Sequence, residues 1–238
     1  MKVIVLSKID YKEKNCIYDA ISETGSLSFQ AKGAQDSKSQ FVWLNNPLTV
    51  ADIELVEDGR YKYKMLKNAY PVSAAVTGGD SLDYLCAIQV LIDIAKNVLS
   101  EEERHGVFDD LLLATSALKA KKDHLIVLSV FLARALKKAG IELEVDKCVF
   151  CGSTQEITAF SLSDGGFVCR RCMNDDITPD LTPNQMKLVR YIFRAPDFSC
   201  MKTEGYSEED KKIVIKKLVA FADEFIGVNL KTFNYFIK

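Results

Sequence analysis

The period of the hydrophobic pattern changes once along the 238-residue chain, near residue 75, and this change restricts the fold more than any other feature. Before it, short runs rich in β-branched and aromatic residues alternate polar and apolar positions, as half-buried strands do. After it, apolar residues recur about every three to four positions, which is typical of amphipathic helices. The sequence therefore predicts a strand-rich part followed by a helical part.

The strand-rich part has the size of a small barrel. The predicted strands cover residues 2–8, 15–22, 26–32, 47–57 and 60–68. In the last of them, Tyr61 and Tyr63 alternate with Lys62 and Lys64, after a hairpin signal at Asp58–Gly59. A small open antiparallel sheet would expose unpaired edges, so this number of strands favours a closed barrel.

The rest of the chain is predicted to be helical, with one interruption. Helices are expected over residues 81–99, 107–119, 124–139, 182–195 and 207–227. Thr182 begins the fourth as N-cap, with Pro183 and Gln185 completing a capping pattern. We expect a barrel domain at 1–75 and a helical domain at 76–238, with an insertion at about 145–177. The predicted fold class is α+β.

The interruption holds two Cys-x-x-Cys pairs, Cys148 with Cys151 and Cys169 with Cys172. Seventeen residues separate the pairs, which is the spacing of a four-thiolate zinc site. Four protein ligands fill a tetrahedron and leave no position for substrate, so the predicted zinc is structural. Iron in a rubredoxin-like site is the chemical competitor, because four thiolates also suit iron. A thioredoxin-like redox pair is less favoured, since no βαβ pattern adjoins either pair.

Composition narrows the class of protein. The formal net charge is −2, so the whole chain does not carry the excess of positive charge typical of many nucleic-acid-binding proteins. Neither a signal peptide nor an apolar run of membrane-spanning length is expected. The other cysteines, Cys16, Cys86 and Cys200, are scattered, which indicates a reducing cytosol and not a secreted disulfide scaffold.

No catalytic constellation is recognisable. The two histidines, His105 and His124, lie outside any metalloprotease or hydrolase motif and are interpreted as ordinary loop or helix-end residues. Phosphate-binding glycine motifs are not found either. A binding or scaffolding role is therefore favoured over catalysis, and the chain is not expected to be an enzyme.

Several segments in combination resemble the RecO family of DNA repair proteins over nearly the whole chain. They are SETGSL (22–27), AKGA (31–34) with Ser39, FLARALKKAG (131–140), CVFCG (148–152), FSLSDGGFVC (160–169) and NLKTF (229–233). The order of these segments carries more weight than any one of them. Family members often have more arginines after the AKGA segment, where this chain has Gln35 and Asp36.

The resemblance implies an N-terminal OB-fold, a helical domain with a zinc finger, and a recombination mediator. Such proteins bind single- and double-stranded DNA and anneal strands coated with single-strand DNA-binding protein. They act with RecR to load RecA, so RecA is an indirect partner, and the expected location is cytoplasmic and nucleoid-associated. A zinc-ribbon transcription or translation factor is the alternative, but the long helices around the ribbon argue against it.

Candidate DNA-binding residues come first from the OB-fold, whose grooves combine cations with aromatic rings. They are Lys32, Lys38, Arg60, Lys62 and Lys64, and the cysteine segment adds Arg170 and Arg171 as candidates to contact phosphate. The alternative for the strand at 60–64 is that its tyrosines face the core. Arg170 and Arg171, with Lys147, would equally offset the charge of the zinc thiolates. Phe29, Phe41 and Trp43 are candidates for base stacking, with core packing as the favoured alternative.

Overall fold

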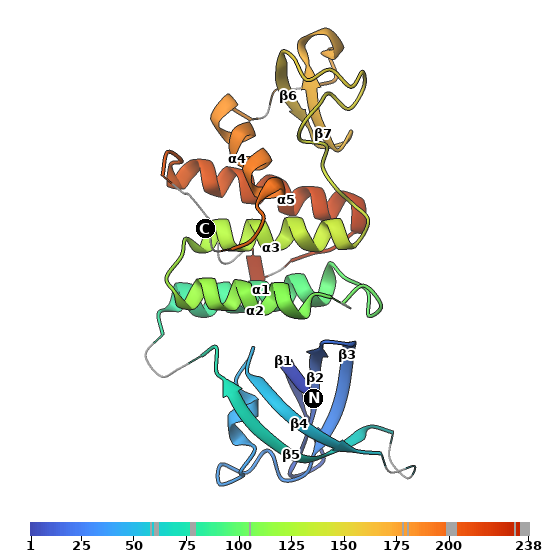
Figure 1. The fold of residues 1–238 in the computed structure, drawn as a ribbon, viewed down its shortest axis with the longest axis vertical. Helices are drawn as coiled ribbons and strands as arrows, with labels where there is room; N and C mark the ends of the chain where they lie inside the picture. The colour runs from blue at the N-terminus through green and yellow to red at the C-terminus, as the bar shows by residue number, and fades with distance from the viewer. Residues whose placement is uncertain are drawn as a thin grey trace.

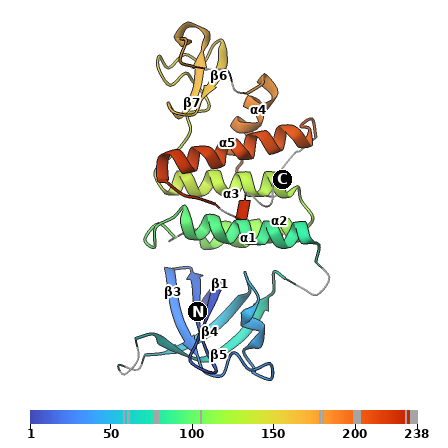
Figure 2. The ribbon, with the colours of Figure 1, turned by 180° about the vertical axis from the view of Figure 1, so that it is seen from behind.

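The computed structural model describes the chain except residues 58, 60–61, 77–79, 105, 178, 180, 199–203, 231 and 234–238. The molecule is elongated, with a β-barrel at one end, layers of helices in the middle and a small two-stranded sheet at the other end (Figure 1). The view from behind shows the same order of layers (Figure 2). The predicted α+β class is confirmed.

The N-terminal strands form a closed barrel. They are β1 (Lys2–Tyr11), β2 (Asn15–Ser22), β3 (Gly25–Ala31), β4 (Val50–Val56) and β5 (Lys64–Ser73). Their order around the barrel is β1-β2-β3-β5-β4, and β4 closes it by pairing with β1. The pairing of β3 with β5 is parallel, and the others are antiparallel. This is the five-stranded arrangement of an OB-like barrel.

The last predicted strand is displaced. It was expected over residues 60–68, but β5 begins at Lys64 and continues to Ser73. Its beginning is fixed by long-range pairing, because Met65 lies opposite both Gln30 of β3 and Val56 of β4. Local alternation of tyrosines and lysines carries no information about those partners.

Aromatic residues fill the barrel interior. Phe29 is fully buried and stacks on Tyr18, with ring centroids 5.3 Å apart. Burial raises the pKa of Tyr18, whose hydroxyl donates a hydrogen bond to Asn45 Oδ1 at 2.8 Å. Phe41 is also buried, so it and Phe29 are core residues, as the favoured alternative held. Trp43 is half-buried, and its indole N–H donates to the Gln40 carbonyl.

The helices are α1 (Leu82–Asn97), α2 (Phe108–Lys119), α3 (His124–Lys138), α4 (Pro183–Arg194) and α5 (Glu208–Ile226). α3 lies in the centre and packs against the other four, which explains why it is apolar on all sides (Figure 1). The capping box of Thr182 and Gln185 is present, and Ser207 with Asp210 caps α5 in the same way. None of the helices in the described part of the chain has the length and hydropathy needed to span a bilayer.

The barrel wall and the helices share a hydrophobic core. Ile4, Leu6 and Ile21 on the outer face of the barrel belong to the same buried cluster as the helices. Beside it, Lys96 of α1 donates to Ser7 Oγ at 2.8 Å and pairs with Asp19 at 3.0 Å. The helices therefore pack against one side of the barrel (Figure 1). We call the opposite end, which carries the β1–β2 turn and which none of the described helices α1 to α5 covers, the open end. There the loop after β3 packs Ala34, Phe41 and Leu44 into the barrel core.

Candidate metal centre and nucleic-acid surface

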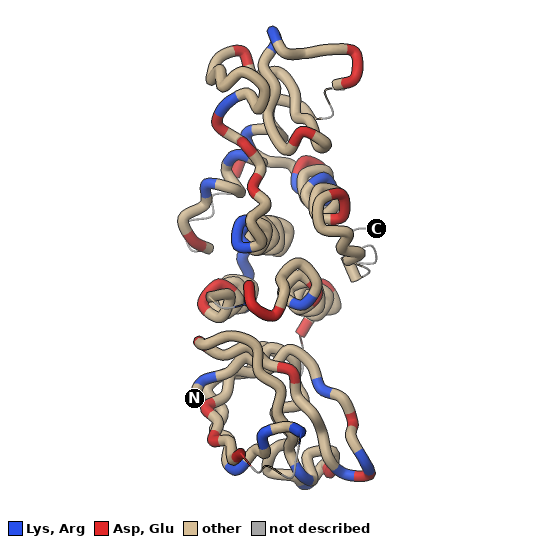
Figure 3. Tube along the Cα trace, turned by 90° about the vertical axis from the view of Figure 1, so that its right-hand side faces the viewer, with Lys and Arg blue, Asp and Glu red and all other residues tan. Residues whose placement is uncertain are grey.

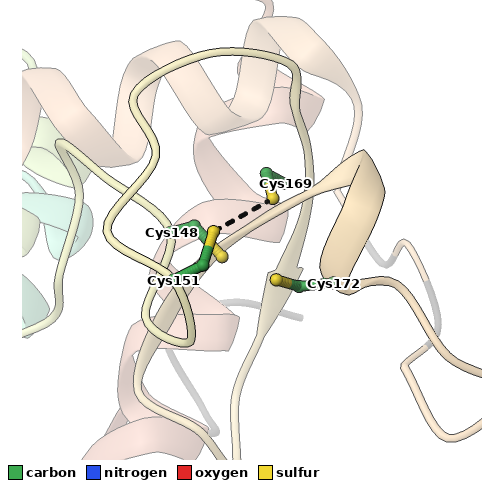
Figure 4. Close-up of side chains that lie close together, drawn as sticks. All are labelled: Cys148, Cys151, Cys169 and Cys172. Carbon is green, nitrogen blue, oxygen red and sulfur yellow. Dashed lines mark hydrogen bonds between the residues drawn. The ribbon is translucent and has the colours of Figure 1, made fainter.

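Two turns bring the four cysteines together. Cys148 and Cys151 lie in the turn before β6 (Ile157–Ser161), where Gly152 has φ +71° and its N–H donates to the Cys148 carbonyl. Cys169 ends β7 (Gly166–Cys169), and Cys172 ends the 3-10 helix η2 (Arg170–Cys172). The four side chains converge on one point (Figure 4).

The sulfur geometry suits a tetrahedral metal ion. All four Sγ atoms lie within 4.8 Å of one another, and Cys151 Sγ is 3.6 Å from Cys169 Sγ. A zinc ion bound at about 2.3 Å by four thiolates would space the sulfurs about 3.8 Å apart. A disulfide requires about 2.0 Å, so the cysteines are free thiols here.

The pKa values of the cysteines differ within the cluster. Burial raises the pKa of the Cys148 thiol, but hydrogen bonds with the backbone of Cys169, Cys151 and Phe150 outweigh it and lower that pKa to about 6. A hydrogen bond with Cys151, reinforced by burial, raises the pKa of Cys172 to about 12. Metal ligation uses the thiolate form of cysteine, and a bound cation would offset the charge of four thiolates.

The segment has a very small core of its own. Its buried apolar cluster consists of Cys148, Ala159, Val168, Cys169 and Ile177, two of which are candidate ligands. At Gly166 the backbone of β7 passes very close to the backbone of Glu144. A side chain would not fit there, because a Cβ would lie 2.5 Å from the Glu144 carbonyl oxygen. So small a core contributes little stability by itself. Small folds of this kind are commonly stabilised by a bound structural metal ion.

The cations beside the cysteines have different surroundings. Lys147 pairs with Glu144 at 3.7 Å. Arg170 and Arg171 are exposed, and neither forms an ion pair with any residue that the structure describes. Their charge is therefore available to a partner in solution.

The candidate lysines of the barrel lie at its open end. The β1–β2 turn and the loop after β3 are held together there, since Gln35 Nε2 donates to the carbonyl oxygens of Lys12 and Asn15 at 3.3 and 2.7 Å. Lys32 and Lys38 follow β3, and Lys62 and Lys64 lie at the start of β5, paired with the end of β3. Figure 3 shows several basic stretches at this end of the barrel.

The lysines at this end differ in whether their ammonium groups already have a partner within the protein. Lys64 forms an ion pair with Glu57 at 3.6 Å, and the Lys62 ammonium lies 5.5 Å from the Tyr63 ring centroid. Lys38 is exposed and forms no ion pair within the described part of the chain. Arg60 lies outside the described residues, as do Tyr61 and His105.

Sequence reasoning missed two lysines of this group. Lys12 and Lys14 are exposed in the β1–β2 turn. Because β2 pairs with β3, this turn lies at the same end of the barrel as Lys32. The signal that could have found them is the length of the first two strands, which fixes where their turn lies. Arg170 and Arg171 are at the opposite end of the molecule from these lysines, so the candidates form two groups (Figure 1).

The chain combines a closed five-stranded OB-like barrel with a helical part that carries a four-cysteine segment. Barrels of the OB type bind nucleic acids in many proteins, so the fold defines a class of modular nucleic-acid-binding proteins. The family model described as "Recombination protein O C terminal" matches residues 79–232. The chain belongs to the RecO family of DNA repair and recombination proteins.

Curated relatives match along nearly the entire chain. DNA repair protein RecO of Shouchella clausii is 30% identical over 96% of this chain and 90% of its own length. The protein of the same name from Exiguobacterium sibiricum is 27% identical over 96% and 92%. That from Bacillus pumilus is 26% identical over 96% and 90%. The similarity thus covers the barrel, the helices and the cysteine segment.

Proposed function

We propose that this protein is a DNA-binding recombination mediator that anneals complementary strands and, together with RecR, assists the loading of RecA. It binds single- and double-stranded DNA, including single strands coated with single-strand DNA-binding protein, and makes or breaks no covalent bond. The observation that carries this proposal is the lysine-rich open end of an OB-like barrel in a member of the RecO family.

DNA would meet the barrel at its open end. The lysines gathered there are Lys12, Lys14, Lys32, Lys38, Lys62 and Lys64. Connecting loops of OB-folds contact oligonucleotides, and lysines bind phosphates as point charges. The barrel aromatics Phe29 and Phe41 are buried, which leaves the half-buried Trp43 as the one predicted stacking residue of the three with an accessible ring, and phosphate contacts to the lysines as the main interaction. Such binding has little sequence preference.

The metal centre would be structural. Cys148, Cys151, Cys169 and Cys172 would hold one zinc ion, and four protein ligands exclude substrate from the metal. The ion would neutralise the thiolates and fix the two turns of the segment. This scaffold would present Arg170 and Arg171 as a second phosphate-binding element, remote from the barrel.

The remaining assignments follow from the same proposal. The barrel domain is residues 1–75, and the helical domain is residues 76–238 with the zinc finger at about 145–177. RecR and single-strand DNA-binding protein are the protein partners, and the place of action is the nucleoid.

DNA binding by the barrel is tested by replacing Lys32 and Lys38 with Ala. Neutralising up to two phosphate contacts should weaken binding to all sequences alike, and it should flatten the dependence of log K on log salt concentration by up to about 2. Titration of labelled oligonucleotides at several salt concentrations measures both. An unchanged slope would remove these lysines from the interface.

The second phosphate-binding element is tested separately by replacing Arg170 and Arg171 with Gln. Both side chains are exposed, so the variant should keep its metal and its thermal stability. DNA affinity should fall, most clearly at low salt, where exposed charges are least screened. Unchanged affinity in a variant that retains its metal would leave these arginines with no role in DNA binding.

A further inference from the structure

A shallow depression of about 740 Å³, widely open to solvent, lies on the surface of α4, on the other side of the helical layers from the open barrel end. It is lined by Asp146, Lys187, Arg190, Tyr191, Arg194 and Tyr206. We call it the α4 hollow. Three cations therefore face one carboxylate, beside two half-buried tyrosine rings. None of these residues belongs to the four-cysteine cluster.

The arginines of the hollow are anchored but still accessible. Arg190 Nε binds Asp146 Oδ1 at 2.9 Å, and Arg194 binds Asp146 Oδ2. The two arginine side chains remain 61% and 58% exposed. Lys187 is exposed and forms no ion pair with any described residue. One carboxylate cannot neutralise three cations, so the hollow keeps a positive charge for an anionic ligand.

The arrangement of the cations indicates a chain of anions. Lys187, Arg190 and Arg194 are spaced three and four residues apart on one helical face. With a rise of about 1.5 Å per residue, they lie about 4.5 and 6 Å apart along the helix axis. A nucleic-acid strand carries one phosphate per nucleotide, and a row of cations along one face can track such a backbone.

The surroundings of these cations favour nucleic acid over an acidic peptide. Tyr191 and Tyr206 lie in the hollow. A nucleic-acid base can stack on a tyrosine ring, whereas the side chain of Asp or Glu has no aromatic ring with which to stack. A second hollow of about 280 Å³ adjoins it and shares Asp146, Lys187 and Arg190, with an apolar lining that includes Ile157, Phe167 and Met186. A splayed-out base would fit such a lining, while its phosphates contact the shared cations.

We infer that the α4 hollow binds a single strand of nucleic acid, separately from the strand held by the barrel. The inference rests on the proposed function, because it assumes that the barrel end binds DNA. Layers of helices lie between the two sites (Figures 1 and 2). One chain would then hold two strands at once, at separate places on its surface.

The test compares three double variants by titration with a labelled oligothymidylate at several salt concentrations. Lys187→Gln with Arg190→Gln should weaken binding and flatten the salt slope by about 1.4, the value for two contacts to a single strand. Lys122→Gln with Lys216→Gln removes the same charge from exposed positions elsewhere and should change neither. Lys32→Ala with Lys38→Ala reports on the barrel site alone.

The outcomes distinguish the two sites. If the barrel variant loses affinity and the α4 variant behaves like the Lys122/Lys216 control, the α4 inference is wrong and the proposed function stands. If the α4 variant loses affinity and the barrel variant does not, the barrel site fails instead. The same titration with a labelled oligoglutamate covers the rival ligand: loss of oligoglutamate binding without loss of DNA binding would overturn the inference. Because Lys187 forms no ion pair with any described residue, Lys187→Gln alone repeats the test without disturbing Asp146.

Discussion

Individual polar residues connect the helices of this protein, and Asp210 is the clearest case. Its carboxylate accepts hydrogen bonds from Ser207 Oγ at 2.8 Å and from Gln185 Nε2 at 2.9 Å. Ser207 caps α5, while Gln185 caps α4, so one carboxylate holds two helix N-termini together. Hydrogen bonds from Ser207 and Gln185 lower the pKa of Asp210 below its ordinary value.

This lowered pKa predicts how stability depends on pH. A carboxylate with a depressed folded-state pKa contributes stability that is complete above its unfolded pKa, about 3.9, and is lost as the pH falls through the folded value. Asp210→Asn should therefore lower the free energy of unfolding at pH 7 by about 1 to 2 kcal/mol. The difference from wild type should shrink as the pH falls below the unfolded pKa.

Urea unfolding of both proteins at pH 7 and at pH values below the unfolded pKa measures the effect. Asp175→Asn is the matched control, because Asp175 is exposed and forms no hydrogen bond or ion pair that involves its side chain within the described residues. A constant difference between Asp210→Asn and wild type down to pH 2 would contradict the account.

At the scale of elements, the cysteine segment is packed in two parts: Phe160 and Phe167 join the main core, whereas the residues around the cysteines form a separate small cluster. β6 and β7 form a two-stranded sheet above a cluster of five buried residues. A sheet of that size is marginal in water, whereas a structural zinc ion supplies on the order of 10 kcal/mol. The metal and the fold of this segment are therefore expected to depend on each other.

Metal analysis tests this expectation. Protein purified without chelator should contain one zinc per chain, and a colourless absorbance spectrum would exclude the rubredoxin-like iron alternative. Cys151→Ser should reduce metal content and expose the segment to proteolysis near residues 145–177, while the barrel remains resistant. Well under one equivalent of any metal, or two disulfides in place of free thiols, would contradict the zinc assignment.

At the scale of the whole molecule, local signals in the sequence were sufficient for much of the fold. The helix cap at Thr182 depends on residues close to it and was predicted correctly, and the two cysteine pairs come together as their spacing indicated. The start of β5 was wrong because it depends on pairing between Met65 and the distant Gln30. The α4 hollow was not foreseen for the same reason, since Asp146 and Arg190 are 44 residues apart in the chain.

The candidate DNA-binding groups lie far apart on the molecule. The lysines of the barrel end and the cations of α4 and η2 lie on opposite sides of the central helical layers (Figure 1). α3 contacts every other helix, and the barrel wall contributes to the same core. Two strands bound at the two ends would thus be carried by one body.

The central claim, that this protein promotes the pairing of complementary DNA strands, is tested most directly by a strand-annealing assay. Two complementary oligonucleotides carry a donor and an acceptor fluorophore, and energy transfer reports duplex formation with and without a coat of single-strand DNA-binding protein. The account predicts that wild-type protein accelerates annealing of both bare and coated strands. It also predicts that the Lys32/Lys38 variant does so more slowly at equal protein concentration. Annealing at the spontaneous rate, by protein that retains its metal and its fold, would contradict the account.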